Sequence, residues 1–219
     1  MTTTFASPVR LASRCMAALA LGALVGCAPM ATYNAAYVVP PQTPVAEKIP
    51  GKALVYTVKA DDDTPFVGAP TSFTGSATKL TIPLGVIARE IAFTVFNDAF
   101  AQGAEKANSL HGVSGYRVIL HPKVASFSYG YFQLQNLGFA ITPTVVLSLD
   151  VQLLDASGKT VQQRRYDSGK VEGKSYMMTG EPGEEIGKVT HQVMLDLMQR
   201  AANDVREWVR SGSAGPMAL

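Results

Sequence analysis

The amino-acid sequence predicts an α+β fold, in which two helices pack on one face of a mostly antiparallel sheet to form a two-layer sandwich. Residues 145–153 alternate apolar and polar side chains, as expected for a strand with one buried face. Residues 84–107 and 184–209 repeat apolar residues with the period of a helix. The elements follow in the order strand, short strand, helix, three strands, helix, which suits one sheet covered by two helices.

The first half of the domain is expected to contain two strands and a helix. The segment ALVYTVK, residues 53–59, reads as the first strand, and KLTIP, residues 79–83, as a short second one. Pro83 suits the first turn of the helix over residues 84–107, because its nitrogen has no hydrogen to donate there. The apolar face of this helix is wider than one stripe. Two explanations remain open: the helix is deeply buried, or one side of it meets another chain.

The second half is expected to contain three strands and the last helix. Residues 116–121 alternate like a strand, and residues 124–134 extend or follow it. The DASGK turn at residues 155–159 joins the strand at residues 145–153 to a return strand. The outer face of this return strand is polar, so one side of the sheet meets water. Acidic residues open the helix over residues 184–209 and basic residues close it, which complements the helix dipole.

The N-terminal segment has the three parts of an export signal. Arg10 and Arg14 precede an apolar run of about ten residues, which is too short to span a bilayer as a helix. The run ends in Leu24-Val25-Gly26-Cys27, which resembles the lipobox of bacterial lipoproteins. The resemblance implies that the Cys27 thiol receives a diacylglyceryl group, that the signal is cut before Cys27, and that the new N-terminus is acylated. Several acyl chains would hold the protein on a membrane, and Ala28 favours the outer one.

These features divide the chain into four parts. Residues 1–26 are the predicted signal peptide, 27–50 the lipidated cysteine with a proline-rich tether, 51–211 a periplasmic domain, and 212–219 a flexible tail. The tether either moves freely or docks along the domain. Cys15 leaves with the signal, so no disulfide or cysteine-based metal site is expected. Removal of Arg10 and Arg14 also cancels the formal net charge of +2, which argues against a nucleic-acid partner.

Motifs for catalysis or metal binding are weak. Asp61-Asp62-Asp63 lacks the spacing of a calcium loop, and Ser76-Ala77-Thr78-Lys79 matches S-x-x-K without the companion motifs of serine acyl-transfer enzymes. The histidines, His111, His121 and His191, lie in three different elements. We therefore predict no metal, no cofactor and no enzymatic activity.

Aromatic residues provide the candidate contact surface. They gather in an alternating segment and in a long loop, and they are Phe127, Tyr129, Tyr131 and Phe132 in the first and Phe66 and Phe73 in the second. One interpretation is a core strand with aromatic packing. The other is a surface that binds a partner, because Tyr and Phe are enriched at interfaces.

Residues 142–173, TPTVVLSLDVQLLDASGKTVQQRRYDSGKVEG, followed by the last helix, resemble auxiliary lipoproteins of ABC-type transport systems and YajG-type lipoproteins. The resemblance implies a non-enzymatic accessory role in an envelope assembly or transport complex, with a protein partner and a membrane anchor through acylated Cys27. One alternative is a carrier of lipid or another small apolar ligand, with a cleft between sheet and helices. Another is an envelope hydrolase. The oligomeric state stays open.

Overall fold

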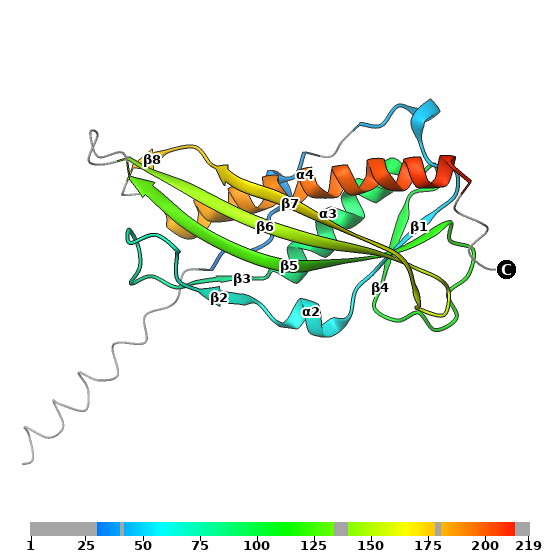
Figure 1. Ribbon diagram of the computed structural model, residues 1–219, viewed down its shortest axis with the longest axis horizontal. Coiled ribbons are helices and arrows are strands. Elements are labelled where there is room, and N and C mark those ends of the chain that lie inside the picture. Colours follow the sequence, from blue (N-terminus) through cyan, green and yellow to red (C-terminus); the bar gives the residue numbers. More distant parts are fainter. Residues whose placement is uncertain (1–29, 40–41, 134–139, 178–180, 213–219) are drawn as a thin grey trace, which may run out of the picture.

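The computed structural model describes residues 30–39, 42–133, 140–177 and 181–212, and its layout is shown in Figure 1. The predicted signal peptide, Cys27 and residues 213–219 lie outside the described residues. A six-stranded sheet runs in the order β4-β1-β5-β6-β7, with β8 paired to β6, and β2 and β3 form a separate pair. The strands are β1 (Ala53–Tyr56), β2 (Phe66–Gly68), β3 (Leu80–Ile82), β4 (Ala104–Ala107), β5 (Val118–Gln133), β6 (Ala140–Leu154), β7 (Thr160–Glu172) and β8 (Tyr176–Met177).

Within the described residues, three α-helices accompany the strands: α2 (Lys59–Asp63), α3 (Leu84–Ala99) and α4 (Pro182–Arg210). The predicted α+β class is thus confirmed. Short 3₁₀ turns lie at Ala35–Tyr37 and Val45–Glu47. Helix α2 was not predicted, because its five residues, KADDD, are too few to show a helical period.

The sheet is mixed: its long strand pairs are antiparallel, as the sequence predicted for most of the sheet, and two short parallel pairs were not predicted. β1 runs parallel to both β4 and β5, and the pairs formed by β5, β6 and β7 are antiparallel. The parallel pair of β1 and β4 was not predicted because α3 ends at Ala99 instead of continuing to residue 107. Gly103 adopts a φ of 72° that suits a turn, and the next four residues form β4 beside β1.

Helices and sheet share one core. α3 contacts β1, β4 and β5, while α4 contacts β6 and β7, and the two helices contact each other. Most of the apolar face of α3 is buried, including Ile87, Ile91 and Phe96, and it meets buried residues of α4 such as Met194 and Leu197. Of the two explanations for the wide apolar face of α3, the described residues support deep burial of the helix. Figure 1 shows the long strands β5, β6 and β7 beside the two helices.

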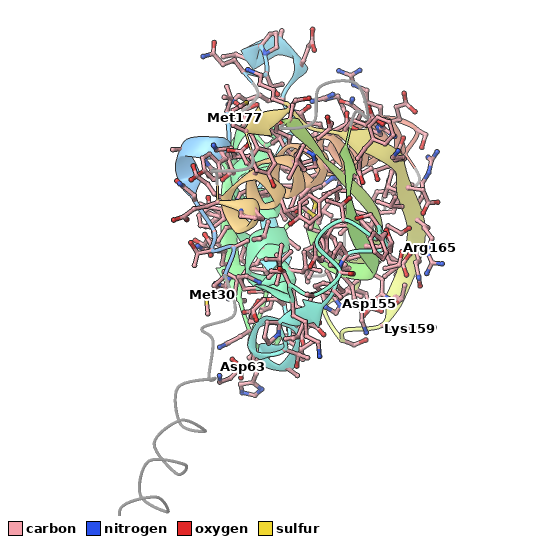
Figure 2. The ribbon with its side chains drawn as sticks, turned by 90° about the vertical axis from the view of Figure 1, so that its left-hand side faces the viewer. Met30, Asp63, Asp155, Lys159, Arg165 and Met177 are labelled. Carbon is pink, nitrogen blue, oxygen red and sulfur yellow. The ribbon has the colours of Figure 1, made fainter. Side chains whose placement is uncertain are left out.

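The predicted turn between β6 and β7 is present and well bonded. The Asp155 carboxylate accepts hydrogen bonds from the backbone N–H groups of Ser157 and Lys159, both at 2.9 Å. Gly158 takes a φ of 85°, which a side chain would strain. Asp155 and Lys159 are labelled in Figure 2.

Residues 30–39 and 42–50, which fall in the predicted tether, pack on the domain. The Ala31 N–H donates to Thr81 O of β3 at 3.0 Å, and the Asn34 N–H donates to His191 Nε2 of α4 at 3.0 Å. Ile49 is buried and its backbone pairs with the end of α3. The docked arrangement is therefore the one that the described residues show.

Candidate functional site

The edge of β5 that faces away from β6 is only partly covered. β1 has four residues and pairs with β5 only from Val118 to Leu120, whereas β5 continues to Gln133. The loop after β2 covers the far end, because the Thr71 N–H donates to Tyr129 O at 2.8 Å. Between these two contacts, a stretch of the β5 edge is not paired with another strand.

Backbone groups on this stretch are open. The Arg117 N–H and the Tyr129 carbonyl both bond outward, away from β6, and the bulge between Val124 and Ser126 shifts the alternation of outward-facing residues between them. Within the described parts of the chain, no backbone hydrogen bond from outside the sheet reaches β5 between Lys123 and Phe127. Open strand edges are uncommon because they invite pairing with another chain.

A groove of about 470 Å³ runs beside this open edge. Its other wall is the arm formed by α2 and β2. The arm is joined to β5 at both ends: Asp61 Oδ2 lies 3.2 Å from His121 Nε2, and the Tyr129 hydroxyl donates to Gly68 O at 2.8 Å. The residues that line the groove are Thr57, Ala60, Asp61, Thr64, Pro65, Phe66, Leu84, Gly85, Pro122, Lys123, Val124, Ala125, Ser126 and Phe127.

Two phenylalanine rings form the apolar part of the groove. Phe66 and Phe127 meet edge to face, with ring centroids 4.9 Å apart. A bulge between Val124 and Ser126 shifts the register of β5. Because of this shift, Val124 and Phe127 both face the core side of the sheet although they are three positions apart in the strand. The bulge therefore places Phe127 opposite Phe66.

The six predicted aromatic residues separate into three groups. Phe66 and Phe127 are half-buried in the groove, while Phe73 and Phe132 are exposed elsewhere. Tyr129 and Tyr131 are buried, which corrects their assignment to a contact surface. Burial, with smaller contributions from Tyr176 and Tyr129, raises the pKa of Tyr131 well above its ordinary value. These two tyrosines fit the other interpretation, a core strand with aromatic packing.

A second cleft of about 640 Å³ lies between α2, α3 and β4, and its charges are paired with one another. Arg89 forms ion pairs with Asp62 and Glu90, and Lys106 Nζ lies 2.8 Å from Glu90 Oε2. Burial alone would raise the pKa of Glu90, but hydrogen bonds from Lys106 and Arg89 hold it below its ordinary value. Charges already paired in this way offer little to an ionic ligand.

The weak sequence motifs do not converge on one site. Asp61, Asp62 and Asp63 contact different partners, namely His121, Arg89 and Lys59. No group of three potential metal ligands occurs among the described residues. Ser76 lies in a turn before β3, with its N–H bonded to Phe73 O, and does not open a helix. Within the same residues, no helix is long and apolar enough to cross a membrane.

No protein-family model and no curated protein matches this chain. Solved structures are similar to it in fold. A protein from Xanthomonas campestris of family DUF330 is 11% identical with a TM-score of 0.56, and the match covers 86% of this chain and 100% of that one. A PelC dodecamer from Paraburkholderia phytofirmans is 14% identical with a TM-score of 0.36, covering 74% and 93%. A minor lipoprotein from Acinetobacter baumannii is 10% identical with a TM-score of 0.29, covering 74% and 94%. At these identities the likeness concerns the fold alone, and among these three the Xanthomonas protein supports it.

Proposed function

We propose that this chain is a lipid-anchored protein of the bacterial cell envelope that binds a protein partner and catalyses no reaction. The lipobox-like Leu24-Val25-Gly26-Cys27 supports the anchor, and Ala28 supports the outer membrane as its location. The likeness of residues 142–209 to auxiliary lipoproteins of transport systems supports the accessory role.

The observation that carries partner binding is the open edge of β5 beside the Phe66–Phe127 groove. An extended segment of a partner can add to this edge as a further strand, because its backbone supplies the missing hydrogen bonds. Alternate side chains of such a segment would point into the groove, where the two phenyl rings favour an apolar residue. Main-chain bonds then supply affinity and the groove supplies selectivity.

The size of the open edge limits the partner segment. The five residues from Lys123 to Phe127 measure about 17 Å along an extended strand. Because the arm is joined to β5 at both ends, the segment must pass between the arm and the strand or displace one of these contacts.

Photo-crosslinking in living cells tests this proposal. A photoreactive phenylalanine replaces Thr64, which lines the groove, or Val67, which lies on the same arm outside the groove. We expect a crosslinked envelope protein with Thr64 and not with Val67, and we expect the crosslink to disappear in Cys27→Ala, which loses the anchor. Equal crosslinking at both positions, or none at Thr64 in a correctly localised chain, would contradict the proposal.

The crosslinked segment also reports how it binds. A synthetic peptide of that segment should bind the protein in titration calorimetry. If it adds to β5 as a strand, N-methylation of alternate residues should weaken binding in one register and spare the other, because only one set of N–H groups faces β5. Equal effects in both registers would exclude strand addition.

A further inference from the structure

One end of the molecule displays apolar side chains to solvent. Phe73 is 95% exposed, Met30 61%, Met177 60% and Phe132 51%. Figure 1 shows the far end of β5, β8 and the loop between β2 and β3 together at the left-hand end. Figure 2 looks onto this end and labels Met30 and Met177. We call these four residues the apolar end.

The most exposed of them, Phe73, is held in place by its own loop. On one side of it, the Thr71 N–H donates to Tyr129 O at 2.8 Å. Next to it, Ser72 Oγ accepts from the Tyr131 N–H at 2.8 Å. Gly75 packs so closely on the Tyr131 ring that an added Cβ would lie 3.0 Å from it. A phenyl ring presented to solvent by a well-bonded loop is preorganised for an apolar surface.

The two segments that carry Phe73 and Phe132 contain no formally charged residue. Residues 69–78 and 124–133 contain no Asp, Glu, Lys or Arg. Insertion of Phe73 into an apolar medium therefore needs no charge of its loop to leave water. At Phe132, Lys170 Nζ lies 5.9 Å from the ring centroid, and its long side chain can keep the charge at the level of the lipid headgroups. The exposed residues Val45 and Val161 differ, because charged residues follow them closely in sequence.

Chain connectivity brings the lipid to this end. Met30 pairs with Thr81 of β3, next to the loop that carries Phe73. Cys27 precedes Met30 by three residues, so it lies within about 10 Å of Met30 even when the chain is fully extended. An acylated Cys27 therefore leaves the domain little freedom to move away from the bilayer.

We propose that the apolar end lies on the membrane and that Phe73 and Phe132 enter the bilayer interface beside the lipid of Cys27. This orientation rests on the proposed lipid anchor. The bilayer is favoured over a protein as the occupant because the anchor holds this end at the lipid surface. The β6–β7 turn and the C-terminal end of α4 then face away from the membrane.

Fluorescence quenching by brominated phospholipids tests the orientation. The full-length lipidated protein with Trp208→Phe is reconstituted into phosphatidylethanolamine and phosphatidylglycerol vesicles, with either Phe73→Trp or Val45→Trp as the sole tryptophan. Val45 is the matched control, because it is 86% exposed and begins the 3₁₀ turn Val45–Glu47 near the C-terminal part of α4. We expect at least twofold quenching of the tryptophan at position 73 and none at position 45. Equal fluorescence in brominated and ordinary vesicles at both positions would overturn the proposal.

Intact mass of the same preparation separates the two proposals. A lipidated chain without quenching at position 73 overturns the orientation and leaves the anchor standing. A mass without lipid overturns the anchor, and vesicle flotation of that chain then decides the orientation by itself. If Phe73→Ser abolishes flotation and Val45→Ser does not, the orientation is supported. If the non-lipidated chain without either substitution does not float, the orientation is overturned. Crosslinking of position 73 to a protein instead of lipid would also overturn it.

Discussion

At the residue scale, His191 links the N-terminal segment to the core. It is fully buried in α4, with Nδ1 2.7 Å from Gly187 O and Nε2 accepting from the Asn34 N–H. The bond to the Gly187 carbonyl requires a proton on Nδ1, so Nε2 is free to accept. A second proton on Nε2 would face the Asn34 N–H and break this contact.

This arrangement predicts a pH-dependent stability. Burial lowers the pKa of His191 below 6.5, although the bond to Gly187 O opposes the shift. The unfolded chain therefore binds a proton at a higher pH than the folded one, and stability is complete above pH 6.5 and falls below it. The loss is up to about 1.4 kcal/mol per pH unit until the folded pKa is reached. Urea unfolding between pH 7.5 and 5 should show this slope in wild type and in His111→Gln, whose histidine is exposed, but not in His191→Gln. An equal slope in all three proteins would refute the assignment.

At the element scale, α2 depends on a glycine of α3. A Cβ on Gly85 would lie 2.0 Å from Asp61 O, so α2 could not keep its position. We expect Gly85→Ala to destabilise the protein by about 1–3 kcal/mol, as overpacking does, and to move one wall of the groove. Differential scanning fluorimetry measures the loss.

Gly187→Ala is the matched control in α4. Its Cβ would lie 3.4 Å from the Ala31 side chain, in ordinary contact. Alanine is favoured over glycine in a helix by about 1 kcal/mol, so this variant should be neutral or more stable. Equal stability changes in Gly85→Ala and Gly187→Ala would show that Gly85 is not required for the close packing of α2 on α3.

Sequence patterns predicted the long elements well and the short ones poorly. The apolar stripe of α4 and the alternation of β6 are sustained over many residues, and both elements lie close to the predicted ranges. By contrast, α3 stops at Ala99 because a turn and the pairing of β4 with β1 compete with the helix. No pattern in the local sequence predicts that two strands of four residues will pair in parallel.

The sequence did not predict the groove, although it did predict two of the residues that line it as contact residues. Phe66 and Phe127 were predicted to be contact residues, but strict alternation placed Tyr129 and Tyr131 on the same surface. The bulge at Val124–Ser126 and the early end of β1 are tertiary features, and together they create the open edge. The long strand predicted at residues 53–59 would have covered more of it.

At the scale of the whole molecule, the N-terminal segment connects the proposed lipid anchor to the apolar end. The N-terminal segment is packed on the domain from Ala31 onward, so the short stretch after Cys27 is the part that sets the distance to the membrane. We therefore expect that inserting about ten Gly/Ser residues between Ala28 and Pro29 will preserve lipidation and folding. It should reduce quenching of a tryptophan at position 73, because the apolar end is then free to leave the bilayer. Unchanged quenching would mean that the apolar end binds lipid strongly without help from the anchor.

Partner binding at the open edge of β5 is best tested by quantitative recovery of the partner from solubilised envelopes by wild type, Phe66→Ala and Val67→Ala. The two substitutions lie next to each other on β2, but only Phe66 lines the groove. We expect Phe66→Ala to lower recovery at least fivefold, while Val67→Ala and wild type recover equal amounts. Equal recovery by all three folded, lipidated proteins would contradict partner binding at the open edge of β5.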